Sequence, residues 1–209
     1  IAVAKRIRTG SVSVNGGSVS GFSGDLNAIA ALRDAALKAD PKTKFEVRHL
    51  PWPQCEAVLT LAGPLARAGT RIAALTEVGA PREGDPVTMK ENEIFGVSAT
   101  TTAARPYLSI IYLQADGSAV ELRRGHPEPD RKGVRQVMIG LSKTAQRYAV
   151  APPFGPELIV ALASDKPLFG DDEVVNGTER QFLTRLRAKL VNHPGDGVSA
   201  AFVRLHTSN

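Results

Sequence analysis

Cys55 is the only cysteine of the chain, so it is the one side chain able to act as a thiol nucleophile. A single thiol excludes an internal disulfide, a paired-cysteine redox centre and a zinc site built on several thiolates. The surrounding sequence, LPWPQCEAVLTL, leads into an apolar helical pattern, which favours a buried small hydrophobic residue. A hydrolase that uses Cys55 stays open as an alternative, since a catalytic site can be assembled from scattered residues.

Five cations cluster around a polar, proline-containing segment in the second half of the chain. They are Arg123, Arg124, Arg131, Lys132 and Arg135. If the chain folds back here, these side chains can converge on an acidic partner or a phosphate-bearing surface. The alternative is a solvated rim in which each cation makes its own contacts. We take these five residues as the candidate site for an anion or a partner.

Motif spacing gives no sign of a metal, cofactor or phosphate site. Four histidines lie in separate segments, without the short spacings of zinc ligands: His49, His126, His193 and His206. The sequences GDD (170–172) and GDG (195–197) lack the remaining ligands of an EF-hand loop, and glycine-rich 11–24 lacks a phosphate-binding spacing. Ser164 has no Gly-x-Ser-x-Gly context. We therefore expect no catalytic residue, cofactor or metal in this chain.

Composition narrows the class of partner. The net charge is +5, but 26 basic and 21 acidic residues are mixed along the sequence and only 5% of residues are aromatic, which leaves few platforms for stacked bases. We expect a protein partner and no nucleic acid. No apolar run approaches the roughly 20 residues of a membrane helix, and the oligomeric state stays open.

The first 70 residues carry strand and helix patterns in the order ββαβα. Residues 11–24 alternate around an Asn-Gly-Gly turn and predict a hairpin. Asp25 stands at the N-cap position of a helix that Pro41 closes, and a strand follows. A second helix runs from Cys55 towards Gly69, and Pro64 predicts a kink or a split into two short turns.

Residues 71–209 show strand patterns separated by turn signals, which are typical of a sandwich or barrel. Ala-Asp-Gly at 115–117 predicts a hairpin, 125–133 predicts a loop, and Thr178 caps a late helix over 178–192. A final strand follows. The predicted class is α+β: a small α/β unit (1–70) packed on an antiparallel β-sandwich-like domain with a C-terminal helix (71–209).

The segment YAVAPPFGPELIVALASDKPLF (148–169) predicts scaffold and not a catalytic loop. Pro152, Pro153 and Pro156 restrict the backbone before an apolar run, ELIVALAS, that is typical of a strand covered on both faces. Trp52, held between two prolines, predicts an apolar plug at the seam of the two units.

The order of turn and strand motifs over about residues 75–170 resembles a bacterial domain of unknown function that occurs C-terminal to caspase-like peptidases and serine/threonine protein kinases. The motifs are GDPVTM, RPYLSIIYLQADGSAVEL and APPFGPELIVALASDKPLF, with Gly84, Asp85, Tyr107, Asp116, Gly117, Pro153, Gly155, Pro156 and Glu157. The resemblance implies a fold and carries no catalytic set. Residues 11–69 faintly resemble small α/β modules of bacterial envelope proteins, which favours a periplasmic or other extracytoplasmic location.

The sequence begins with Ile1 and lacks the motifs of a kinase or of a caspase-like peptidase. We therefore expect a fragment of a larger bacterial protein whose catalytic domain lies outside this chain. The function predicted from sequence is a non-catalytic interaction or regulatory module that binds a protein partner through sandwich loops or an exposed strand edge.

Overall fold

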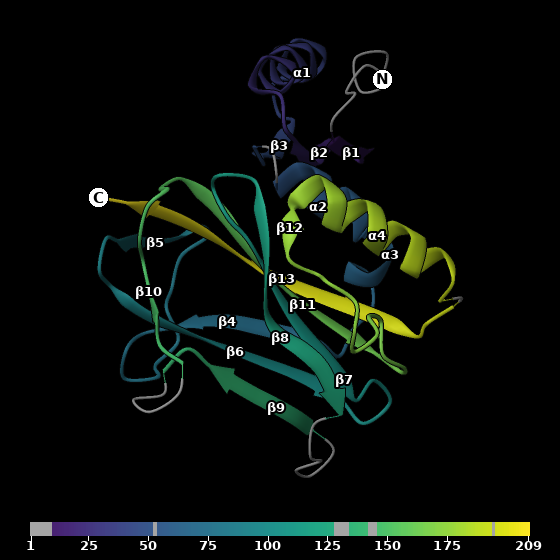
Figure 1. Ribbon diagram of the computed structural model, residues 1–209. Helices are drawn as coiled ribbons and strands as arrows, with labels where there is room; N and C mark the ends of the chain where they lie inside the picture. Colours follow the sequence, from purple (N-terminus) through teal and green to yellow (C-terminus); the bar gives the residue numbers. More distant parts are fainter. Residues whose placement is uncertain (1–9, 52–53, 128–133, 142–145, 194) are drawn as a thin grey trace. The chain divides into compact units, whose positions relative to one another are not determined.

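A computed structural model describes residues 10–51, 54–127, 134–141, 146–193 and 195–209 (Figure 1). The chain divides into two compact units between Leu59 and Thr60, whereas the sequence placed the boundary after residue 70. Trp52, Arg131 and Lys132 lie outside the described residues, so the predictions for them stay predictions.

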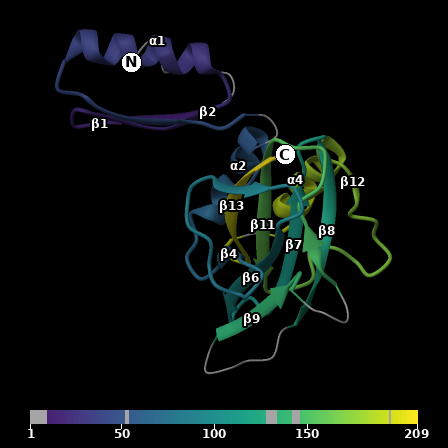
Figure 2. The same cartoon turned by 90° about the vertical axis from the view of Figure 1, so that its left-hand side faces the viewer.

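The first unit is a three-stranded sheet with a helix along one face (Figure 2). Its elements are β1 (Gly10–Asn15), β2 (Ser18–Ser23), α1 (Leu26–Ala39), β3 (Lys44–His49) and most of α2 (Gln54–Thr60). β1 and β2 form the predicted antiparallel hairpin, in which Gly16 and Gly17 take the positive φ of the turn. β3 pairs with β2 in parallel, since α1 crosses between them.

Asp25 confirms the predicted start of α1, because its carboxylate accepts hydrogen bonds from the backbone N–H groups of Asn27 and Ala28. Val19 of β2 and Leu32 of α1 are buried. The opposite face of this sheet carries Ser11, Ser13 and other polar side chains, so the unit has a small core on one side only.

The second unit contains two sheets. The smaller sheet comprises β4 (Arg71–Leu75), β6 (Ile94–Thr102), β9 (Val134–Ile139) and β10 (Tyr148–Ala149), with β6 between β4 on one side and β9 and β10 on the other. The larger sheet has the order β12 (Gly177–Thr178), β8 (Ser118–Pro127), β7 (Tyr107–Leu113), β11 (Pro156–Ser164), β13 (Val198–Ser208) and β5 (Val87–Lys90).

The two sheets share one core. Phe95, Val97 and Ala99 of β6 pack in one buried cluster with Ile159 and Ala161 of β11. Alternate β11 residues, Leu158, Val160 and Leu162, are also buried and point to the other face. The prediction that this strand is covered on both faces is confirmed.

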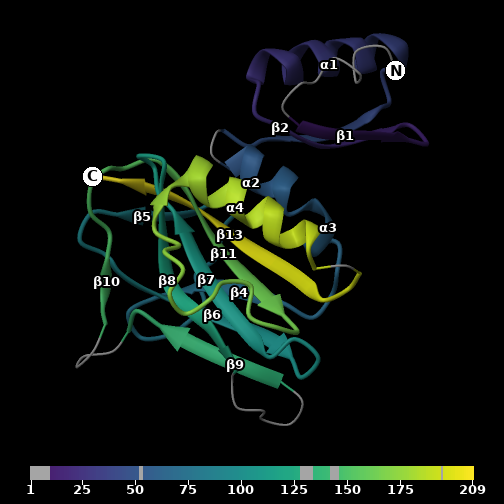
Figure 3. The same cartoon turned by 45° about the vertical axis from the view of Figure 1, so that its right-hand side comes forward.

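A helix, α4 (Glu179–Val191), lies over that other face of the larger sheet (Figure 3). Thr178 caps the helix as predicted: its side chain accepts from the backbone N–H of Gln181, and the Gln181 side chain accepts from the backbone N–H of Thr178. Phe182, Leu183 and Leu186 form the buried side of the helix. The region of Pro64 splits into α2 and a short α3 (Ala62–Leu65), one of the two outcomes that the sequence left open.

Three details differ from the sequence-based prediction. Residues 125–127 extend strand β8 instead of starting a loop, because they pair with Tyr107 and Leu108 of β7. The strand β4 was not predicted. β5 runs parallel to β13, so the sandwich is not wholly antiparallel. A parallel pair needs a long connection and not a hairpin, and here most of the second unit lies between the two strands in the sequence. No helix in the described part of the chain is long and apolar enough to cross a membrane.

Candidate functional site

Of the five predicted cations, the structure describes Arg123 and Arg124 on β8 and Arg135 on β9. Arg124 lies on β8 and is engaged within the protein: it pairs with Glu121 at 2.7 Å and donates to the backbone carbonyls of Gly170, Asp171 and Glu173. These bonds tie the segment after β11 to the larger sheet. The role of the Arg124 guanidinium is therefore structural.

Arg123 and Arg135 belong to different sheets. Arg123 pairs with Ile110 across β7 and β8, and burial lowers its pKa below the ordinary arginine value. Arg135 lies on β9 opposite the buried Thr101. Binding of an anion by the whole predicted cluster remains a prediction, since Arg131 and Lys132 lie outside the described residues.

Cys55 is 4% exposed, which confirms its prediction as a buried small side chain. It packs close to Gly24: a Cβ atom built on Gly24 would stand 3.3 Å from the Cβ of Cys55. Burial raises the pKa of the thiol and so disfavours the thiolate that a nucleophile needs. This environment gives no support to the hydrolase alternative.

The four histidines lie in four different segments: His49 on β3, His126 on β8, His193 after α4 and His206 on β13. Within the described ranges, no three His, Cys, Asp or Glu side chains group as metal ligands would.

Glu157 is a buried carboxyl group that the sequence showed only as part of a turn motif. It is 2% exposed and accepts a hydrogen bond from the hydroxyl of Tyr112 and one of 3.4 Å from the backbone N–H of Ala115. Burial raises its pKa above the ordinary value of 4.5, against the opposing effect of these bonds. It joins β11 to β7 and to the turn that follows, which is a structural role.

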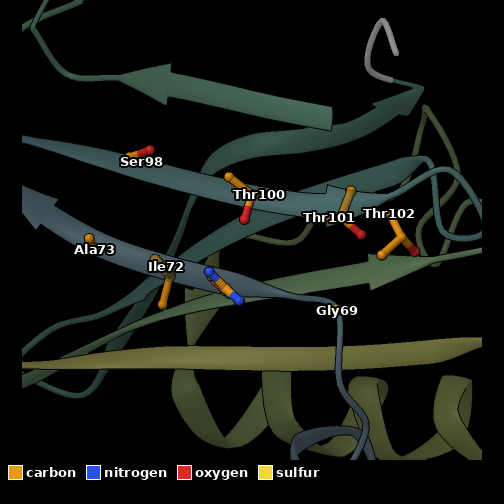
Figure 4. A pocket seen from close by; sticks show the side chains of 8 residues that line it. Gly69, Ile72, Ala73, Ser98, Thr100, Thr101 and Thr102 are labelled. Carbon is orange, nitrogen blue, oxygen red and sulfur yellow. The ribbon is translucent and has the colours of Figure 1, made fainter. Parts of the chain in front are cut away.

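A groove of about 540 Å³ lies along β4 and β6 of the smaller sheet (Figure 4). Val97 and Ala99 point into the core, so the alternate residues Ser98, Thr100 and Thr102 point outwards. The lining consists of small, hydroxyl-bearing or apolar side chains and one cation: Gly69, Arg71, Ile72, Ala73, Ser98, Thr100, Thr101 and Thr102.

The register of the two strands builds this surface. Arg71 lies directly opposite Thr100 and Ala73 opposite Ser98, so these side chains share the outer face. Gly69 is required at the end of the groove, because it has φ +109° and a Cβ there would approach Thr102 Cγ2 to 3.0 Å. This site was not predicted from the sequence, because Arg71–Leu75 lacks the alternation of polar and apolar residues that is typical of a strand.

The groove has a cationic end. Arg71 is exposed and makes no hydrogen bond or ion pair with any residue that the structure describes. Arg105 stands next to Gly69 and donates to the carbonyls of Ala68 and Asp196 at 3.2 and 2.8 Å. No carboxylate belongs to the lining, so this surface favours anionic groups over cationic ones.

Comparison with models of protein families found no match for the chain. No curated protein matches it either.

Proposed function

We propose that this chain is a non-catalytic interaction module that binds a protein partner through the outer face of the β4–β6–β9 sheet. The observation that carries the proposal is an asymmetry of the sandwich. α4 covers the outer face of the larger sheet, whereas no described helix of the second unit lies over the outer face of the smaller one (Figures 1 and 3).

The composition of this face suits reversible association. A sheet normally buries one apolar face and exposes a polar one. Here the exposed face carries hydroxyls, the amide of Gln136 and the guanidinium of Arg71, for which the described residues provide no partner, beside the groove. Gln136 of β9 already donates to Ser98 at 3.1 Å, which orders the polar groups on the surface. Such prearranged groups lower the entropy cost of binding.

The other chemically capable side chains have structural tasks, which supports the same proposal. Arg124 holds the chain after β11, Glu157 joins neighbouring strands, and Cys55 is buried. From the resemblance over residues 75–170 we further propose that the module is part of a larger bacterial kinase- or peptidase-type protein, in which it recruits or regulates.

The test compares two tryptophan variants as baits in an extract of the source cells, at low and at moderate salt. Thr100→Trp fills the groove, and Thr88→Trp is the control, because Thr88 is exposed on β5 of the other sheet. We expect wild type and T88W to retain the same partner protein, identified by mass spectrometry, and T100W to lose it. Equal retention by T100W would refute the assignment of this face, and retention of polyanions alone, removed by salt, would favour the Arg123–Arg135 region instead.

A further inference from the structure

The groove has the period of an extended peptide. Ser98, Thr100 and Thr102 follow one another at every second residue of β6, all on the outer face. Four residues of strand span about 13 Å, and side chains on one face repeat at about 6.6 Å. A peptide in extended conformation has the same repeat, so its alternate side chains can meet successive hydroxyls.

The two ends of the groove differ in chemistry, because one is cationic and the other lies beside an exposed apolar side chain. Its Gly69 end holds the guanidinium of Arg71, which bonds to none of the described residues, and the neighbouring Arg105, which donates to carbonyl groups. At the other end Met138, which pairs with Ser98 across β6 and β9, is 55% exposed. The lining contains no Asp or Glu, and the chain as a whole carries a net charge of +5.

These features favour an acidic peptide over a nucleic acid or an anionic sugar polymer. The lining includes no Phe, Tyr or Trp on which a base or a sugar ring could stack. Hydroxyl groups both donate and accept, so Thr100 and Thr102 can pair with the carbonyl, N–H or carboxylate groups of a peptide. A second copy of this basic chain would bring like charges together.

Resting on the proposed function, we infer that the groove of β4 and β6 binds an extended, acidic segment of the partner protein. Carboxylates of the segment lie at Arg71 and Arg105, and an apolar side chain of the segment lies against Met138. Thr100 and Thr102 bond to the segment between these two ends.

The inference is tested by NMR titration of the full chain with two capped peptides, Glu-Val-Asp-Val-Glu-Val and Gln-Val-Asn-Val-Gln-Val. We expect the acidic peptide to shift the amide signals of Ala73, Thr100 and Thr102, and the amide peptide to leave them unchanged.

Arg71→Gln should weaken binding of the acidic peptide about tenfold, since it removes a charge-assisted hydrogen bond. Arg180→Gln, an equal change of net charge on the exposed side of α4, should not. Salt should weaken the interaction, because the charges are exposed.

Equal binding of both peptides, shifts confined to another surface, or no binding would overturn the inference. So would groove signals that move with protein concentration alone, since they would assign this face to self-association. If T100W loses the native partner but the acidic peptide does not bind, the proposed function stands and the acidic specificity is wrong. If the peptide binds and T100W keeps its partner, the proposed function fails although the groove accepts acidic segments.

Discussion

At the scale of single residues, buried polar groups show how this chain uses its chemistry for structure. Arg124 and Cys55 were candidates for binding or catalysis from the sequence, and Glu157 is a buried carboxyl group, but the contacts of all three are structural. Arg71, by contrast, lines the groove and makes no hydrogen bond or ion pair with any described residue.

Glu157→Gln should change how stability depends on pH. Burial raises the folded-state pKa of Glu157 above 4.5, so its favourable contribution is complete below the unfolded pKa and is lost as pH rises through the folded pKa. We expect the variant to match wild type within about 1 kcal/mol at acidic pH, because an amide preserves shape and an acceptor, and to be the more stable protein at neutral pH. Urea unfolding across this pH range measures the difference, with exposed Glu83→Gln as the control. Parallel pH profiles of wild type and E157Q would contradict it.

Cys55 should react slowly with a thiol reagent in the folded protein and fully after denaturation. Its burial both blocks access and raises the thiol pKa, so few thiolates are available. The measurement is the time course of labelling by a chromogenic disulfide, with and without denaturant. Rapid stoichiometric labelling of the native chain would restore the hydrolase alternative.

At the scale of elements, the features that depend on neighbouring residues in the sequence were predicted best. The Asn-Gly-Gly hairpin, the caps Asp25 and Thr178 and the doubly covered strand β11 follow from residues adjacent in sequence. The groove could not be predicted, because it depends on a non-local pairing: β4 is short and composed of Arg-Ile-Ala-Ala-Leu, without the alternation of a strand, and only its partner β6 defines its faces. The parallel pairing of β5 with β13 was missed for the same reason.

Thr178→Ala should lower the free energy of unfolding by about 1 kcal/mol, since it removes the N-cap of α4 and half of the capping box. The matched control is Thr184→Ala on the exposed side of the same helix, where the hydroxyl only bonds to Arg180 O; we expect a change within about 0.5 kcal/mol. Chemical denaturation measures both. Equal effects would mean that the capping hydroxyl stabilises α4 no more than the hydroxyl of Thr184 does.

Arg124→Ala should destabilise the protein by about 1–3 kcal/mol, because carbonyls of residues 170–173 and the partly buried Glu121 lose a charged donor. Hydrogen exchange should show faster opening of 170–173 in this variant than in Arg180→Ala, which alters an exposed arginine. Unchanged exchange in this segment would show that Arg124 does not hold it.

At the scale of the whole molecule, the chain consists of two units of unequal size, and the second holds the sandwich and the groove. Their packing on one another, as predicted from sequence, stays a prediction. The coarse class, α+β, is confirmed by sheets and helices in the described chain. At this scale, the proposed function rests on the outer face of the β4–β6–β9 sheet, over which no described helix of the second unit lies.

The most direct test of that claim is photo-crosslinking in the source organism. The photoreactive residue benzoylphenylalanine replaces Thr100 in the groove or, as the control, Thr88 on β5, and mass spectrometry identifies what each position captures. The account predicts crosslinks from position 100 to one protein partner and none from position 88. Crosslinks to that partner from position 88 alone would show that the outer face of the β4–β6–β9 sheet is not the binding surface.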